Sequence, residues 1–144
     1  MQTEAEQESG GRGPAPHYSG WVVFAVTGRH LEPEDVTRRL GTEPDRVVLA
    51  AAERDAVWQI NSTLPAQSNI EEHLWELMNR LLPMRHELRR LARDWRVEFF
   101  CAVESLRGTV QRIDLSPRLL LFIGHLGAHL AWEFSDHPAE PDHE

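Results

Sequence analysis

The segment from Tyr18 to Val26 constrains the fold more than any other part of this chain. It contains a continuous run of β-forming residues from Trp21 to Val26, with apolar side chains at both odd and even positions. Successive side chains of a strand point to opposite faces, so such a run predicts a strand with apolar contacts on both faces. We therefore expect a central strand that ends at Gly28.

Two helices are expected in the middle of the chain from their caps and spacing. Pro33 fits the first position of a short helix that ends at Leu40, before a capping Gly41. Ser68 and Glu71 predict a capping box at the start of a longer helix. The apolar stripe of that helix has helical spacing and consists of Ile70, Leu74, Leu77, Met78 and Leu81.

Two more helices follow from the same kind of signal. Pro83 is expected to start or to kink a second helical stretch that ends near Asp94, and the apolar side of this stretch carries Met84, Leu88 and Leu91. Ser116 and Pro117 predict the start of a last helix through Leu121. The glycines expected near the end of this helix are Gly124 and Gly127.

The remaining strands are expected at residues 46–49, 56–60, 97–104, 110–113 and 128–134. The strand at 97–104 alternates apolar and mixed residues, and a tight loop at Arg107-Gly108 is expected to return it as the strand 110–113. Phe99 and Trp132 are expected to be core residues on facing or adjacent strands. Segregated hairpins and helices predict an α+β fold, with a mostly antiparallel five- to six-stranded sheet and three to four helices packed on one face.

The two ends of the chain differ in composition from the part between them. Residues 1–17 and 136–144 are rich in Glu, Asp, Pro, Gly and His and lack apolar periodicity. Such segments bury too little surface to offset their ordering entropy, so we expect disordered acidic tails around one domain at 18–135. The first 17 residues contain no secretory signal, and the longest apolar run, from Trp21 to Val26, is far too short to span a membrane. We therefore expect a cytoplasmic protein without a membrane partner.

Several turn and capping motifs occur in a characteristic order between residues 18 and 135. They are Thr27-Gly28, Leu31-Glu32-Pro33-Glu34-Asp35-Val36, Leu40-Gly41-Thr42-Glu43-Pro44, Val57-Trp58, Ile70-Glu71-Glu72-His73-Leu74, and the stretch from Leu115-Ser116-Pro117 to Leu126-Gly127-Ala128. In this order and spacing the chain resembles the bacterial domain of unknown function family 4279. The resemblance implies a compact α+β domain and brings no established activity or catalytic residue.

Catalytic and metal-binding arrangements fail on geometry. The single cysteine, Cys101, alternates with Val and Phe on an apolar strand face, which is typical of a small core residue. Ser135-Asp136-His137 are neighbours in the chain and cannot converge as a triad. His125 and His129 have the spacing of a zinc pair, but Gly127 is expected to end the helix between them. We expect no catalytic residue, no metal site and no cofactor.

A stripe of arginines is the local feature closest to a function. Arg85, Arg89 and Arg93 recur every four residues and therefore lie on one side of their helix. An ordinary solvated helix face explains such a stripe, and an anion-binding surface is the alternative. The ligand of such a surface would be an acidic protein segment, this chain's own tail included. The net charge of −8 argues against a nucleic acid partner.

These features predict a non-enzymatic binding or protein-interaction domain, able to form a homodimer through its sheet face or long helices. The alternative is a small-molecule enzyme whose site combines residues distant in sequence, with His30, His73, Glu98 and His129 as candidates. A deep pocket that encloses two or more of these four would favour the enzyme, and a flat arginine surface would favour the binding domain.

The five tryptophans are expected to be mainly core anchors. Trp75 and Trp95 flank the apolar stripes of the long helices, so one of them is expected to be partly exposed at a contact surface.

Overall fold

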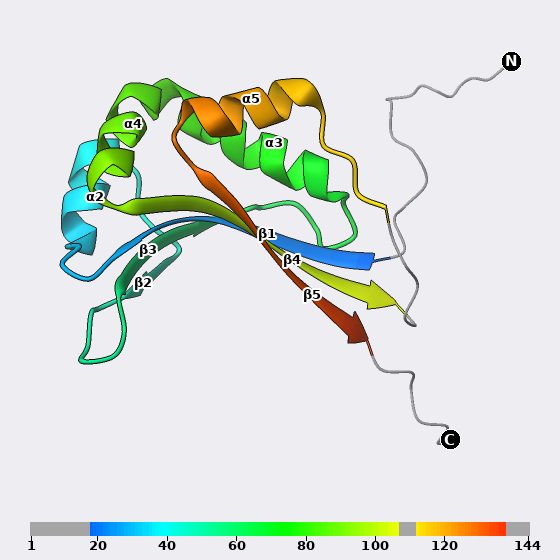
Figure 1. Cartoon of the computed structure of the whole chain (residues 1–144), viewed down its shortest axis with the longest axis horizontal. Helices are drawn as coiled ribbons and strands as arrows, with labels where there is room; N and C mark the ends of the chain where they lie inside the picture. Colours follow the sequence, from blue (N-terminus) through cyan, green and yellow to red (C-terminus); the bar gives the residue numbers. More distant parts are fainter. Residues whose placement is uncertain (1–17, 107–111, 138–144) are drawn as a thin grey trace, which may run out of the picture.

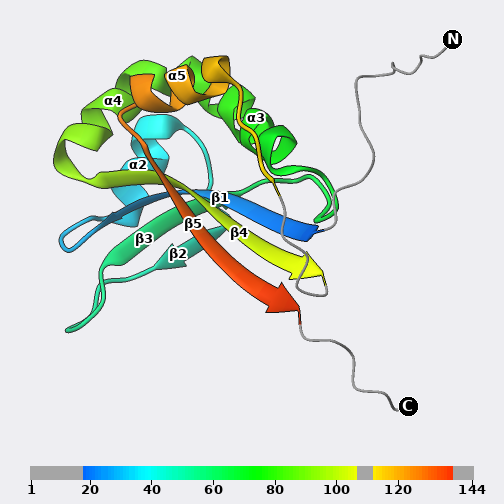
Figure 2. The same ribbon diagram turned by 45° about the vertical axis from the view of Figure 1, so that its right-hand side comes forward.

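The computed structural model describes residues 18–106 and 112–137. The elements follow the order β1 (Tyr18–Gly28), α2 (Pro33–Leu40), β2 (Arg46–Val48), β3 (Ala56–Asn61), α3 (Ile70–Leu81), a short 3-10 helix (Leu82–Met84), α4 (Arg85–Asp94), β4 (Arg96–Leu106), α5 (Pro117–His125) and β5 (His129–His137). The strands form one five-stranded sheet in the order β2-β3-β1-β4-β5. The four α-helices within the described residues lie on one face of this sheet (Figures 1 and 2). The predicted α+β fold is confirmed.

The sheet is mixed rather than purely antiparallel. The pairs β1–β3, β1–β4 and β2–β3 are antiparallel, whereas β4 and β5 run parallel. A parallel neighbour needs a crossover connection, and α5 provides it by carrying the chain back over the sheet. The strand predicted at 110–113 lies partly outside the described residues, and Arg112 and Ile113 are not in a strand.

The core lies between the sheet and the helices. Even-numbered residues of β1 and odd-numbered residues of β4 point to the helices, and Phe24 meets Phe99 edge to face with ring centroids 5.2 Å apart. The stripe predicted for α3 is fully buried against them, as are Leu88 and Leu91 of α4. Phe99 is therefore a core residue as predicted, while Trp132, on the adjacent strand, is only partly buried.

The start of α3 corrects the predicted cap by one residue. Asn69, not Ser68, is the N-cap, and its side chain accepts a hydrogen bond from the backbone N–H of Glu72 at 2.9 Å. The Glu72 carboxylate accepts one from the backbone N–H of Asn69 in return. Asparagine and serine are equally good N-cap residues, so the residue types alone do not decide between Ser68 and Asn69 as the cap. The correction leaves Glu71 available for another contact.

The predicted caps of α2 and α5 are confirmed, whereas Pro83 lies in the 3-10 helix before α4 and α5 continues to His125, beyond the predicted Leu121. Ser116 caps α5 by accepting from the backbone N–H of Leu119, and Pro117 occupies the first helical position. Gly41 and Gly127 follow α2 and α5 with φ of 67° and 75°, values that favour glycine. The last strand, β5, continues to His137, two residues beyond the predicted end of the domain.

The opposite face of the sheet is not covered by any described helix (Figure 1). The strand β1 is central, as predicted, but one of its faces is open, and Trp21 on this face is 49% exposed. Trp75 and Trp95 are both partly buried, so Trp21 is the more exposed residue.

The expected homodimer stays a prediction. The predictions for 1–17 and 138–144 concern residues outside the described ranges, and no helix within those ranges is long and apolar enough to cross a membrane.

Candidate functional site

Two of the three predicted arginines line a small hollow between the C-terminal ends of α4 and α5. This hollow, called the basic hollow below, has a volume of about 300 Å³. Its lining consists of Arg89, Ala92, Arg93, Gly124, His125, Leu126 and Gly127. Three basic side chains from two helices thus surround one depression.

Local packing explains why these residues meet. The helix α4 buries Leu88 and Leu91 against the core, which turns Arg89 and Arg93 outward on successive turns. The turn after α5 passes close to α4. A Cβ atom placed on Gly127 in this turn would lie only 3.0 Å from the Cβ of Ala92 on α4. This close approach brings His125, the last residue of α5, next to the two arginines.

The basic groups of the hollow have no acidic partner within the described ranges. None of the carboxylates there forms an ion pair with Arg89, Arg93 or His125, and all three residues are exposed. The neighbouring Arg90, by contrast, pairs with Glu87 at 3.5 Å. Two arginines and a histidine without a described carboxylate partner therefore lie together at the hollow.

The third predicted arginine lies outside this arrangement. Arg85 is exposed on the first turn of α4, where its guanidinium group donates to the carbonyl oxygen of Leu82 at 3.0 Å. It does not line the basic hollow. The structure thus separates Arg85 from the pair formed by Arg89 and Arg93.

The chemistry of the hollow suits binding an anion. Guanidinium groups offer several N–H donors in a planar fork that fits carboxylates. Cations in the last turn of a helix also stabilise that helix, which accounts for Arg93 and His125 individually. Helix stabilisation does not require that they converge on one depression. The lining contains no hydroxyl, thiol or carboxylate side chain, so it offers no nucleophile beside His125.

The candidates for an enzyme site are dispersed. Neither the basic hollow nor a second hollow beside α2 and β2 is lined by His30, His73, Glu98 or His129. Only Glu98 and His129 are neighbours, as register partners on β4 and β5. Glu98 accepts a hydrogen bond from Arg96 at 2.8 Å, and His129 is exposed on the open face.

His73 is instead part of the interior. Its Nδ1 atom lies 2.7 Å from the hydroxyl oxygen of Ser62, while its buried Nε2 has no hydrogen-bond partner among the described residues. Burial lowers the pKa of His73 below its ordinary value of 6.5, and this outweighs the opposite effects of Glu72, the Pro65 carbonyl and Glu76. The ring is therefore held neutral and packs as a core residue.

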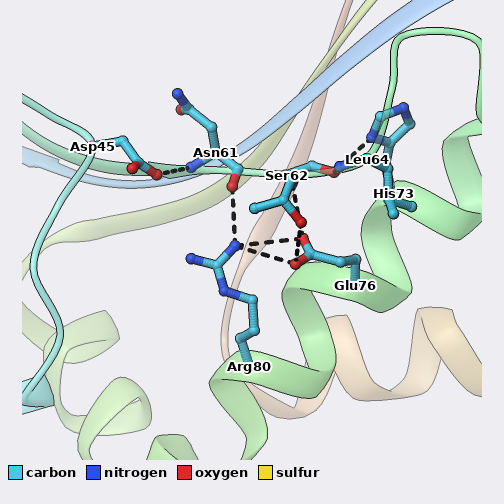
Figure 3. A network of polar contacts seen from close by, with 8 residues as sticks. Asp45, Asn61, Ser62, Leu64, His73, Glu76 and Arg80 are labelled. Carbon is cyan, nitrogen blue, oxygen red and sulfur yellow. Dashed lines mark hydrogen bonds and ion pairs between the residues drawn. The ribbon is translucent and has the colours of Figure 1, made fainter.

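A polar network beside His73 anchors the connection from β3 to α3 (Figure 3). Arg80 donates to the carbonyl oxygen of Asn61 at 3.0 Å and pairs with Glu76 at 3.4 Å. The backbone N–H of Asn61 donates in turn to Asp45 at 2.7 Å. Arg80 and Glu76 pair with each other, and Asp45 accepts from a backbone N–H, so each charged group has a partner, as is typical of structural support.

Cys101 is fully buried on the helix-facing side of β4. Burial raises the pKa of its thiol to about 12, so the reactive thiolate is suppressed. The interpretation of Cys101 as a core residue is confirmed.

In the sequence, His125 stood out only through its zinc-pair spacing with His129, and nothing there placed it beside Arg89 and Arg93. Its neighbours in the hollow lie on another helix, and no spacing along the chain signals that contact. The weak signal for a basic group at this place was the position of His125 near the end of a helix that is followed by Gly127.

Comparison with known proteins gives one family. The family described as "Domain of unknown function (DUF4279)" matches residues 16–137. Neither the curated proteins nor the solved structures contain a significant match to this chain.

Proposed function

The chain belongs to DUF4279, a family of domains of unknown function, and we propose that it is a bacterial, cytoplasmic protein and a non-enzymatic interaction module, whose basic hollow binds an acidic protein segment. The observation that supports this most directly is the convergence of Arg89, Arg93 and His125 on one hollow without a described carboxylate partner.

The distribution of charge favours a short acidic segment over a nucleic acid. The chain carries a net charge of −8, and Asp94 follows directly after Arg93 on α4. A polyanion that contacts a long surface would meet these carboxylates, and its affinity depends on many neutralised phosphates. Two or three neighbouring carboxylates match the three basic groups of the hollow.

A titration with short peptides tests this proposal. The probe is a peptide of six glutamates, and a peptide of six glutamines is the neutral control. Amide chemical shifts of the isotope-labelled protein should change at the C-terminal ends of α4 and α5 with the first peptide only. The affinity should fall steeply when NaCl is raised from about 50 to about 300 mM.

Charge reversal in the hollow distinguishes specific binding from general attraction. The double variant Arg89→Glu/Arg93→Glu should weaken binding of the glutamate peptide at least about tenfold. Exposed charges rarely contribute more than about 1 kcal/mol to stability, so the fold should persist. The matched control is Arg85→Glu, on the same helix but outside the hollow. Equal losses in both variants, or unchanged binding in the double variant, would contradict the proposal.

A further inference from the structure

A larger groove lies between α2 and the edge strand β2. It has a volume of about 730 Å³. Its lining consists of Leu31, Glu32, Pro33, Glu34, Thr37, Arg38, Glu43, Pro44, Val47 and Leu49. We call it the α2–β2 groove. It shares no residue with the basic hollow.

One wall of this groove exposes apolar side chains. Val47 is the register partner of the buried Trp58 and so points to the side of the sheet that α2 covers. Val47 is 44% exposed, and Leu49, two residues further on, is 67% exposed. Opposite them, Leu31 and Pro33 at the start of α2 are buried and continue the apolar surface. Contiguous exposed apolar groups that border a groove are typical of a binding surface.

The second property of the groove is an available strand edge. Within residues 18–106 and 112–137, β2 pairs with β3 alone, and it is the first strand in the sheet order. Proteins commonly protect such an edge, because its unpaired backbone groups bind other extended chains. An extended peptide beside β2 would gain backbone hydrogen bonds and also contact Val47 and Leu49.

The third property is the charge of the rim. Glu32, Glu34 and Glu43 line the groove, and none of them forms an ion pair with a described basic residue. Arg38, the basic residue of the lining, already contacts Asp35. Such a rim attracts cationic side chains and repels acidic segments and anionic lipid surfaces.

From these three properties we propose that the α2–β2 groove binds an extended segment of another protein that adds as a strand beside β2. In this segment an apolar side chain enters the groove and lysine or arginine residues flank it. The apolar side chain packs between α2 and the pair Val47 and Leu49. The flanking cations approach the carboxylates of Glu32, Glu34 and Glu43. The site therefore selects charge of the sign opposite to that selected by the basic hollow.

The test uses a synthetic peptide of alternating residues, Lys-Val-Lys-Leu-Lys-Val, and the full-length protein. Saturable amide shifts confined to α2 and β2 are expected, with at least about tenfold weaker binding when glutamates replace the lysines. A peptide methylated at every backbone nitrogen should also bind at least about tenfold more weakly, because neither of its edges can donate hydrogen bonds to β2. Absence of saturable shifts up to about 1 mM peptide, or equal binding of the methylated peptide, would overturn the proposal.

A pair of matched variants places the contact. Leu49→Arg should weaken binding at least about tenfold, whereas Leu121→Arg, at a similarly exposed leucine of α5, should leave it unchanged. Both leucines are exposed, at 67% and 70%, so both variants should keep the far-UV circular dichroism of the parent. Equal affinity of Leu49→Arg and the parent would overturn the proposal even if the peptide binds elsewhere on the domain.

Discussion

Glu71, in the first turn of α3, accepts a hydrogen bond from the backbone N–H of Ser116 at 2.8 Å. Ser116 caps α5, so this bond joins the starts of two helices that are distant in sequence. The same carboxylate accepts from the indole N–H of Trp75 at 3.1 Å. Glu71 thus satisfies a helix terminus and holds an aromatic side chain at the contact between α3 and α5.

Replacing Glu71 by alanine should lower the free energy of unfolding by about 1–3 kcal/mol, because two donors lose their charged acceptor. Glu71→Gln keeps a carbonyl oxygen and should lose less. Urea unfolding measures both, with Glu53→Ala in an exposed turn as the control. Equal losses for Glu71→Ala and Glu53→Ala would show that the bond to Ser116 contributes nothing.

A second prediction concerns the fully buried Trp58. Its indole N–H donates to the hydroxyl oxygen of Thr37 on α2 at 3.0 Å. Thr37→Val leaves this N–H without its acceptor in the core and should cost about 1–3 kcal/mol. In a protein that already carries Trp58→Phe, and so lacks the indole N–H, Thr37→Val should lower the free energy of unfolding much less. A double-mutant cycle with a coupling near zero would rule out a stabilising bond.

The buried histidine predicts loss of stability in acid. Burial lowers the pKa of His73 in the folded state, so the unfolded chain binds the proton more tightly. The stability associated with neutral His73 is therefore complete above its ordinary pKa of 6.5 and declines as the pH falls below that value. Unfolding by urea at about pH 7.5 and about pH 5 should show a smaller difference for His73→Gln than for the parent. The same difference in both proteins would contradict this role.

Aromatic truncations should follow a gradient across β4 and β5. Phe99 is completely buried, Trp132 is partly buried, and Phe134 is 62% exposed although it stacks on Trp132. Phe99→Ala should cost about 3–5 kcal/mol, and Trp132→Ala should cost less. Phe134→Ala should stay within about 1 kcal/mol. A larger loss at Phe134 than at Phe99 would mean that an additional surface covers the end of β5.

Local signals account for most of the agreement between sequence and structure. Pro33 with Gly41, and Ser116 with Pro117, define helix ends through backbone chemistry that depends on few neighbours. The parallel pairing of β5 depends instead on where a crossover helix lies. The predicted return strand at 110–113 implied a hairpin, whereas the described chain continues from residue 112 into α5 before it reaches β5.

The basic hollow, too, was predictable only where local signals in the sequence point to it. Arg89 and Arg93 follow from periodicity along one helix, because residues four apart share a face. His125 joins them only through the packing of a turn against Ala92, which is a tertiary contact without a signal in the spacing. The α2–β2 groove combines residues from a turn, a helix and an edge strand, and its exposed Val47 reads in the sequence as an ordinary strand residue.

The position of β1 in the sheet has a consequence for the protein during its synthesis. The strand pairs on one side with β3 and on the other with β4, and its first partner in β4 is Arg96. A ribosome therefore releases β1, α2, β2, β3 and both long helices before the second edge of β1 can be matched. Until then this apolar strand presents an open edge, a state that molecular chaperones recognise and that favours misassembly between nascent chains.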